Sequence, residues 1–136
     1  TVKHRLTLAY QQNHLGSQER QFIEAHTSFA GARLMPCVSV SFLRVTLVGN
    51  NLNERVTFDR DVTFVAGPRK ECLSRVVIGE VKQGQYSNYH GAVAVLRGLH
   101  LREAAFSKYC VGTTLVAGVP GNIFKPTLKT IERLSA

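Results

Sequence analysis

The stretch CVSVSFLRVTLVGNNLNERVTFDRDVTFV, residues 37–65, predicts the core of the fold. Residues 37–48 are rich in β-branched and aromatic side chains, which favour a strand. Gly49-Asn50-Asn51 is a turn signal, and polar and apolar side chains alternate again over residues 54–65. The stretch therefore predicts an antiparallel hairpin of two long strands.

Strand periodicity places alternate side chains on opposite faces of this hairpin. Arg44 interrupts an apolar run and alternates with Phe42 and Val40. The polar face of the second strand is predicted to carry Arg55, Thr57, Asp59 and Asp61, and its other face Val56 and Phe58. Each strand of the hairpin thus presents a cation on a defined face.

Two further strands are predicted on either side of the hairpin. Residues 75–83 form the clearer one, with Ile78, Glu80 and Lys82 on one face, after a polar loop opened by Gly67-Pro68. Residues 1–9 form the other, with Lys3 and Arg5 on one face. Lys and Glu are depleted in strands, so their place in the middle of residues 75–83 favours a functional role.

Helices are predicted around these strands. The first follows Ser17, a plausible N-cap, and has Phe22, Ile23 and Phe29 at helical spacing. Residues 90–105 predict a second helix, which Gly91 and Gly98 weaken. Residues 107–116 are ambiguous between helix and strand, and residues 124–134 predict a short terminal helix.

The composition indicates an acidic partner. The formal net charge of +8 arises from a small number of acidic residues, and the basic residues are spread along the chain. The three cysteines are far apart and lack zinc spacing, which favours reduced thiols in a cytoplasmic setting. No apolar run reaches the ~18–20 residues of a membrane span.

Cations that converge inside a sheet require a counter-charge. Two of them ~5 Å apart at an effective dielectric of ~20 repel by roughly 3 kcal/mol. A linear phosphate chain supplies the compensation through charge-assisted bonds, which are bidentate to arginine. Taken singly, each cation is more simply a solvated residue on the outer face of the sheet.

Four segments resemble the VTC domain family, in the family's order over about residues 36–126. Phe42–Leu47 followed by Glu54–Asp61 is similar to its paired strands, and Val77–Lys82 to its later E-x-K strand. Phe106–Gly112 resembles its closing F-S-K-Y-x-x-G segment, and Phe124-Lys125-Pro126 the F-K-P of bacterial members. The hairpin and the F-S-K-Y segment are the more specific matches.

The resemblance implies an α+β fold with an antiparallel β tunnel, or partial barrel, and flanking helices. It implies polyphosphate polymerase-like phosphoryl transfer from ATP inside a tunnel that holds triphosphate or polyphosphate. By the same resemblance, Glu80 would hold a divalent cation, Mn or Mg. The phosphate ligands implied, with catalytic roles for the last four, are Lys3, Arg5, Arg44, Arg55, Lys82 and Lys108.

The chain is also shorter than a complete VTC domain. The resemblance therefore describes residues 1–136 as a single domain that is the C-terminal portion of a tunnel, with earlier strands missing. Phe42 and Leu43 stand where the family often has Tyr and Arg. Whether this portion alone is an enzyme, and whether it forms an oligomer, are left open by the sequence.

Two alternative functions fit the same charge. A nucleic-acid-binding β domain would want exposed aromatics between its cations, whereas Phe42 and Phe58 stand where a packed sheet needs them, so DNA is not the expected partner. A triphosphatase of the same tunnel class would act on small triphosphates. The F-S-K-Y segment favours the polymerase-like branch.

Overall fold

The computed structural model describes residues 4–7, 14–29, 34–50, 53–85 and 91–135. It divides into two compact units, Thr1–Cys37 and Val38–Ala136. The second unit contains the sheet and three of the four α-helices that the described residues form, so the α+β class is confirmed.

The first unit contains helix α1, Ser17–His26. Its N-cap is Gly16, which makes no side-chain cap hydrogen bond, so the prediction that Ser17 caps the helix is wrong. Residues 4–7 are not in a strand, and the rest of the strand predicted over residues 1–9 lies outside the described residues. The ring of His26 packs instead against the rings of His4 and Phe22, at centroid distances of 4.0 and 4.5 Å.

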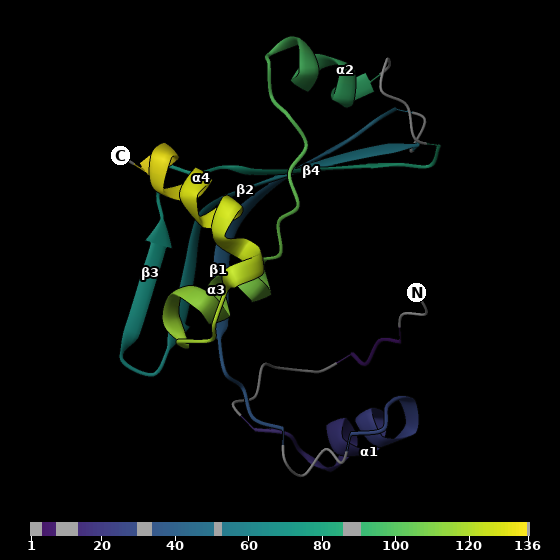
Figure 1. Cartoon of the computed structure of the whole chain (residues 1–136). Coiled ribbons are helices and arrows are strands. Elements are labelled where there is room, and N and C mark those ends of the chain that lie inside the picture. Colours follow the sequence, from purple (N-terminus) through teal and green to yellow (C-terminus); the bar gives the residue numbers. More distant parts are fainter. Residues whose placement is uncertain (1–3, 8–13, 30–33, 51–52, 86–90, 136) are drawn as a thin grey trace. The chain divides into compact units, whose positions relative to one another are not determined.

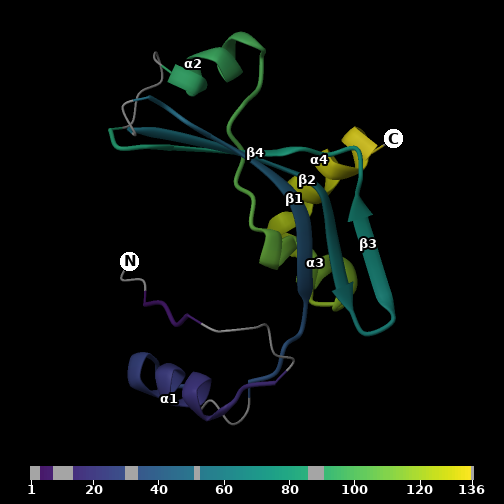
Figure 2. The same ribbon diagram turned by 180° about the vertical axis from the view of Figure 1, so that it is seen from behind.

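The second unit is built on β2, Glu54–Ala66. Strand β1, Ser39–Val48, pairs antiparallel with one edge of β2 along most of its length. The other edge of β2 is shared by β4, Ile78–Gln83, on its first half and by β3, Arg69–Leu73, on its second half. Figures 1 and 2 show β2 running between these partners.

The predicted hairpin is confirmed, and so is the strand predicted over residues 75–83, except that it begins at Ile78. Two further corrections apply. Residues 69–73, predicted as part of a polar loop, form β3. Within the described ranges the sheet has four antiparallel strands and is not closed into a barrel. Closure requires a pairing between edge strands, and among the described residues β1 and β4 pair only with β2.

A β-bulge divides β2 into two halves. Between Ser41 and Leu43 on β1, the partner on β2 moves from Thr63 to Arg60, which is one residue more than regular pairing needs. Asp61 takes the extra position with φ 53°, in the left-handed region. The bulge changes the alternation, so the face that carries odd-numbered residues up to position 59 carries even-numbered residues from position 62.

Asp61 therefore does not share the face of Asp59, and the predicted alternation is wrong beyond the bulge. Beyond it, the same face of β2 presents Val62 and Phe64, both fully buried. Helices α3, Lys108–Val116, and α4, Lys125–Ser135, cover this half of the sheet (Figures 1 and 2). The core consists of Val62, Phe64, Leu73, Val76, Val111, Val116 and Ile131.

Helix α3 lies against β2 because a glycine allows it. A Cβ at Gly112 would stand 2.5 Å from Cδ1 of Phe64. The hydroxyl of Ser107 accepts a hydrogen bond from the Cys110 amide at 3.3 Å and begins the helix. The sequence left residues 107–116 open, and tertiary packing makes them a helix.

Helix α2, Gly91–Gly98, is shorter than the helix predicted over residues 90–105. The carboxylate of Glu54, the first residue of β2, accepts hydrogen bonds from the Ala92 amide at 3.0 Å and from Nε2 of Gln83 at 2.7 Å. Glu54 thereby anchors the start of α2 to the end of the sheet. Among the described residues, no helix is long and apolar enough to cross a bilayer.

Candidate functional site

The register of the sheet aligns the charged side chains in rows across three strands. Arg44 lies opposite Asp59, which lies opposite Ile78. Thr46, Thr57 and Glu80 form the next row. Val48, Arg55 and Lys82 form the third row, all on the same face.

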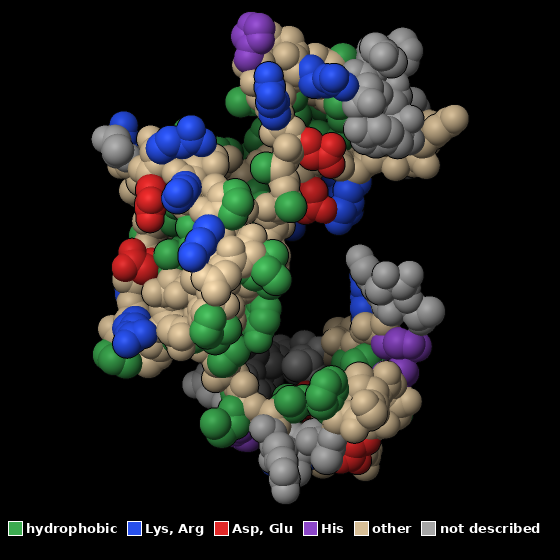
Figure 3. All heavy atoms as spheres, viewed as in Figure 1, with side chains coloured by type: hydrophobic (Ala, Val, Ile, Leu, Met, Phe, Trp, Pro, Cys, Tyr) green, Lys and Arg blue, Asp and Glu red, His purple; other side chains and the backbone are tan. Residues whose placement is uncertain are grey.

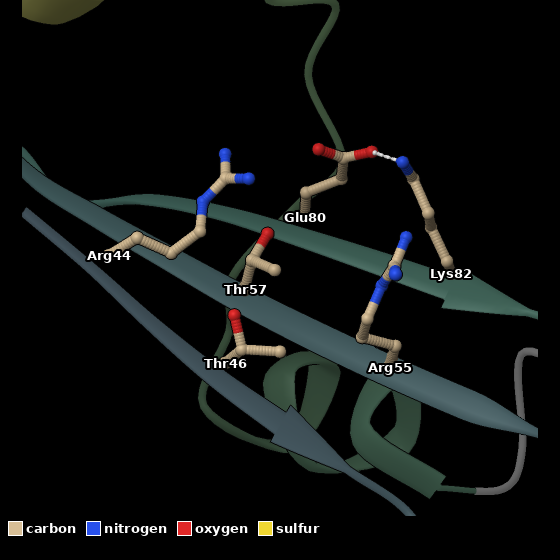
Figure 4. A pocket seen from close by; sticks show the side chains of 6 residues that line it. All are labelled: Arg44, Thr46, Arg55, Thr57, Glu80 and Lys82. Atoms are coloured by element: carbon tan, nitrogen blue, oxygen red, sulfur yellow. Dashed lines mark ion pairs between the residues drawn. The ribbon is translucent and has the colours of Figure 1, made fainter. Parts of the chain in front are cut away.

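Six residues of these rows line an open pocket of about 130 Å³: Arg44, Thr46, Arg55, Thr57, Glu80 and Lys82. Figure 4 shows all six side chains rising from the same face of the sheet, with the two threonines between the arginines. Cations from β1, β2 and β4 thus meet at one place. On the face seen in Figure 3, by contrast, Lys and Arg side chains are scattered over the surface.

Next to the pocket, the same face of the sheet holds a buried carboxylate that sequence reasoning placed on this face but did not single out. The side chain of Asp59 is 2% exposed. Its Oδ1 accepts a hydrogen bond from Nε of Arg44 at 2.6 Å, and its Oδ2 accepts one from Nη2 of Arg44 at 2.8 Å. Nζ of Lys108, the first residue of α3, lies 2.6 Å from the same Oδ2.

Electrostatics reflect this geometry. The hydrogen bonds from Arg44, followed by those from Lys108, lower the pKa of Asp59 from 3.8 to about 2, although burial acts in the opposite direction. The same bond with Asp59 raises the pKa of Arg44. The ring of Phe42 adds to the cluster, since its centroid lies 4.9 Å from Cζ of Arg44 and 5.1 Å from Nζ of Lys108.

Glu80 is the second carboxylate at the site. Its Oε1 lies 2.9 Å from Nζ of Lys82, and this contact is the main cause of the lowered pKa of Glu80. The charges of Arg44 and Lys108 also lower the pKa of Glu80, so both residues contribute to the positive potential in the pocket. Four cations, Arg44, Arg55, Lys82 and Lys108, against Asp59 and Glu80 leave the site with a charge of +2.

The site offers few ligands for a metal ion. Within the described ranges, no three His, Cys, Asp or Glu side chains are grouped as a metal site requires. Asp59 is committed to two cations, whereas the Glu80 side chain is 48% exposed and lines the pocket. Mg²⁺ is commonly held by one or two carboxylates together with substrate phosphates and water, so Glu80 fits the role of a single protein ligand.

The remaining predicted site residues lie elsewhere. Lys3 lies outside the described residues, and Arg5 belongs to the first unit, where it is exposed. The structure therefore brings together five of the seven predicted residues, Arg44, Arg55, Glu80, Lys82 and Lys108. It adds Asp59, Thr46 and Thr57 to them.

Comparison with known proteins gives one match. The family model for the VTC domain matches residues 3–117, which is most of the chain. No curated protein and no solved structure matches the chain.

Proposed function

The chain belongs to the VTC domain family, and from this premise we propose that its basic sheet face binds a linear phosphate chain. The family is of the polyphosphate polymerase and triphosphate tunnel class. The expected ligands are tripolyphosphate, longer polyphosphate and the phosphates of ATP.

The convergence of cations from separate strands on one pocket carries this proposal. Arg55 and Lys82 face each other across β2 and β4, and the guanidinium of Arg44 stands on the far side of two threonine hydroxyls (Figure 4). Arginine matches phosphate with two parallel N–H bonds, and a hydroxyl can donate a third. A row of such donors fits a ligand with several linked phosphates better than a ligand with a single negative charge.

A divalent cation would bind through Glu80 and the phosphate oxygens. When bound, it would neutralise charge on a transferring phosphoryl group. In the free protein Glu80 pairs with Lys82, so a metal ion or a phosphate would have to exchange for one member of this pair.

In phosphoryl transfer the residues of this chain would act by position and charge. We propose that Arg55 and Lys82 hold one part of the phosphate chain, and that Arg44 and Lys108 stabilise the negative charge at the other. Such chemistry depends on orientation and electrostatic stabilisation and needs no covalent nucleophile. Lys3 and Arg5 are proposed as further phosphate ligands from the first unit.

Tripolyphosphate binding tests the proposal directly. At a hundredfold excess over its Kd, tripolyphosphate should raise the melting temperature by about 5–10 °C, through mass action on the folded state. Arg55→Ala should abolish this rise, whereas Arg102→Ala, a control at an exposed residue outside the pocket, should keep it. Equal shifts in all three proteins would exclude the pocket as the binding site.

Turnover requires a separate assay. We expect this chain alone to make little polyphosphate from ATP with Mn²⁺, because the four strands of the described residues form an open sheet. Product analysis distinguishes the alternatives, since release of free phosphate from triphosphate would indicate the hydrolase branch. Arg55→Ala should lower either activity.

A further inference from the structure

Asp59 is more deeply buried than any other acidic residue in the described part of the chain, and it does not line the pocket. It joins three elements, since it stands on β2 and binds Arg44 of β1 and Lys108 of α3. Each carboxylate oxygen is within 2.6 Å of a cationic nitrogen. A carboxylate so placed can hold the cations in the absence of any ligand.

Without the carboxylate of Asp59, the closeness of the Arg44 and Lys108 charges would be unfavourable. Arg44 and Lys108 both approach the ring of Phe42, at 4.9 and 5.1 Å, so their charges lie near each other. Lys108 is also the first residue of α3, where the helix dipole favours an anion and disfavours a cation. A local arrangement that conflicts with these preferences is typical of a functional site.

We propose that Asp59 is a resident counter-anion, which balances Arg44 and Lys108 in the free protein and competes with a bound phosphate chain for their charge. This inference rests on the proposed function. Arg44 and Lys108 keep 41% and 22% of their side chains exposed, so an incoming anion can still reach them. The site is thereby preorganised at the cost of some affinity.

The substitution Asp59→Asn separates balance from shape, because the amide has nearly the same size and no charge. The site charge rises from +2 to +3 when one of its two carboxylates is lost. The free protein should melt at a lower temperature. Tripolyphosphate should bind at least about threefold more tightly, because the nearby negative charge that opposed it is gone.

The experiment measures tripolyphosphate binding by calorimetry, together with melting temperatures, for the wild-type protein, Asp59→Asn and the double variant Asp59→Asn/Lys108→Met. The double variant restores the site charge to +2, with three cations and one carboxylate, so the gain in affinity should disappear. A purely structural role of Asp59 would lower the melting temperature in both variants and leave no gain to reverse.

Three results would overturn the inference while leaving the proposed function intact. The first is a lower affinity of Asp59→Asn for tripolyphosphate, which is expected if Asp59 only positions the cations. The second is an unchanged affinity of Asp59→Asn. The third is a gain in affinity that persists in the double variant. Absence of binding by the wild-type protein would instead reject the proposed function.

Poor folding of Asp59→Asn has its own test. Tripolyphosphate added during refolding should recover the folded protein, since it supplies the missing negative charge, whereas sodium chloride of equal ionic strength should not. Equal recovery in the two solutions, or recovery in neither, would contradict the role of Asp59 as a counter-anion.

Discussion

Asp59 shows what alternation along a strand can and cannot predict at the scale of the residue. Alternation places Asp59 on the face of Arg55, and the register confirms it. Alternation does not predict the ion-pair partners of Asp59, because Arg44 belongs to the preceding strand and Lys108 to a helix much later in the chain. Sequence spacing does not encode such contacts, so the cations of the pocket were predictable and their shared counter-charge was not.

The lowered pKa of Asp59 predicts a specific loss of stability in acid. A carboxyl with a pKa of 3.8 when unfolded and about 2 when folded stabilises the protein above about pH 5, by about 2 kcal/mol. This contribution is lost as the pH falls from about 5 towards 2. Urea unfolding between pH 2 and 7 should therefore show a steeper loss for the wild-type protein than for Asp59→Asn, and parallel profiles would contradict the ion cluster.

At the scale of the element, strands with strong patterns were predictable, and elements decided by packing were not. The strands of residues 39–48, 54–66 and 78–83 follow from β-branched runs and alternation. Strand β3 has the polar sequence RKECL, and it forms because its backbone completes the second half of the β2 edge. Helix α3 has β-branched residues and a glycine, and it is helical because that glycine lets it approach β2.

Gly112 therefore predicts an unusual response to alanine. Alanine favours a helix by about 1 kcal/mol over glycine, yet a Cβ at Gly112 would stand 2.5 Å from the fully buried ring of Phe64. We expect Gly112→Ala to destabilise the protein by about 1–3 kcal/mol through overpacking. Urea denaturation measures the change.

Gly98 provides the matched control. It ends α2, and a Cβ there would meet no atom within 4 Å. Gly98→Ala should be neutral or stabilise by up to about 1 kcal/mol. Equal effects of the two alanines would contradict the close contact between α3 and β2.

At the scale of the whole molecule, the class of fold was predictable and the closure of the sheet was not. Pattern predicts strands, an antiparallel hairpin and helices, and the resemblance implies the α+β class, which the structure confirms. The resemblance implied a tunnel or partial barrel, whereas the described residues form an open four-stranded sheet. Closure depends on pairing between distant strands, which local pattern does not determine.

The net charge of +8 also predicts how the ligand classes differ. A single-stranded oligonucleotide should bind weakly and lose its affinity as salt rises past ~0.15 M, because dispersed surface charges are screened over ~8 Å. Tripolyphosphate held among Arg44, Arg55 and Lys82 should retain more of its affinity. Competition titrations at two salt concentrations would measure this, and displacement of tripolyphosphate by equimolar oligonucleotide would favour a nucleic-acid-binding protein.

Because of the extra residue at Asp61, the number of residues in β2 matters more to the structure than the identity of most of them. Upstream of it the strand directs Arg55 and Thr57 to the ligand side, and downstream it directs Phe64 to the hydrophobic interior of the same side. Deletion of one residue there would move the side chains of one half of β2 to the opposite face of the sheet. Either Arg55 would then point away from the pocket, or Phe64 would be exposed to water. Descendants of this gene should therefore tolerate many replacements along the strand and almost no insertion or deletion at that point.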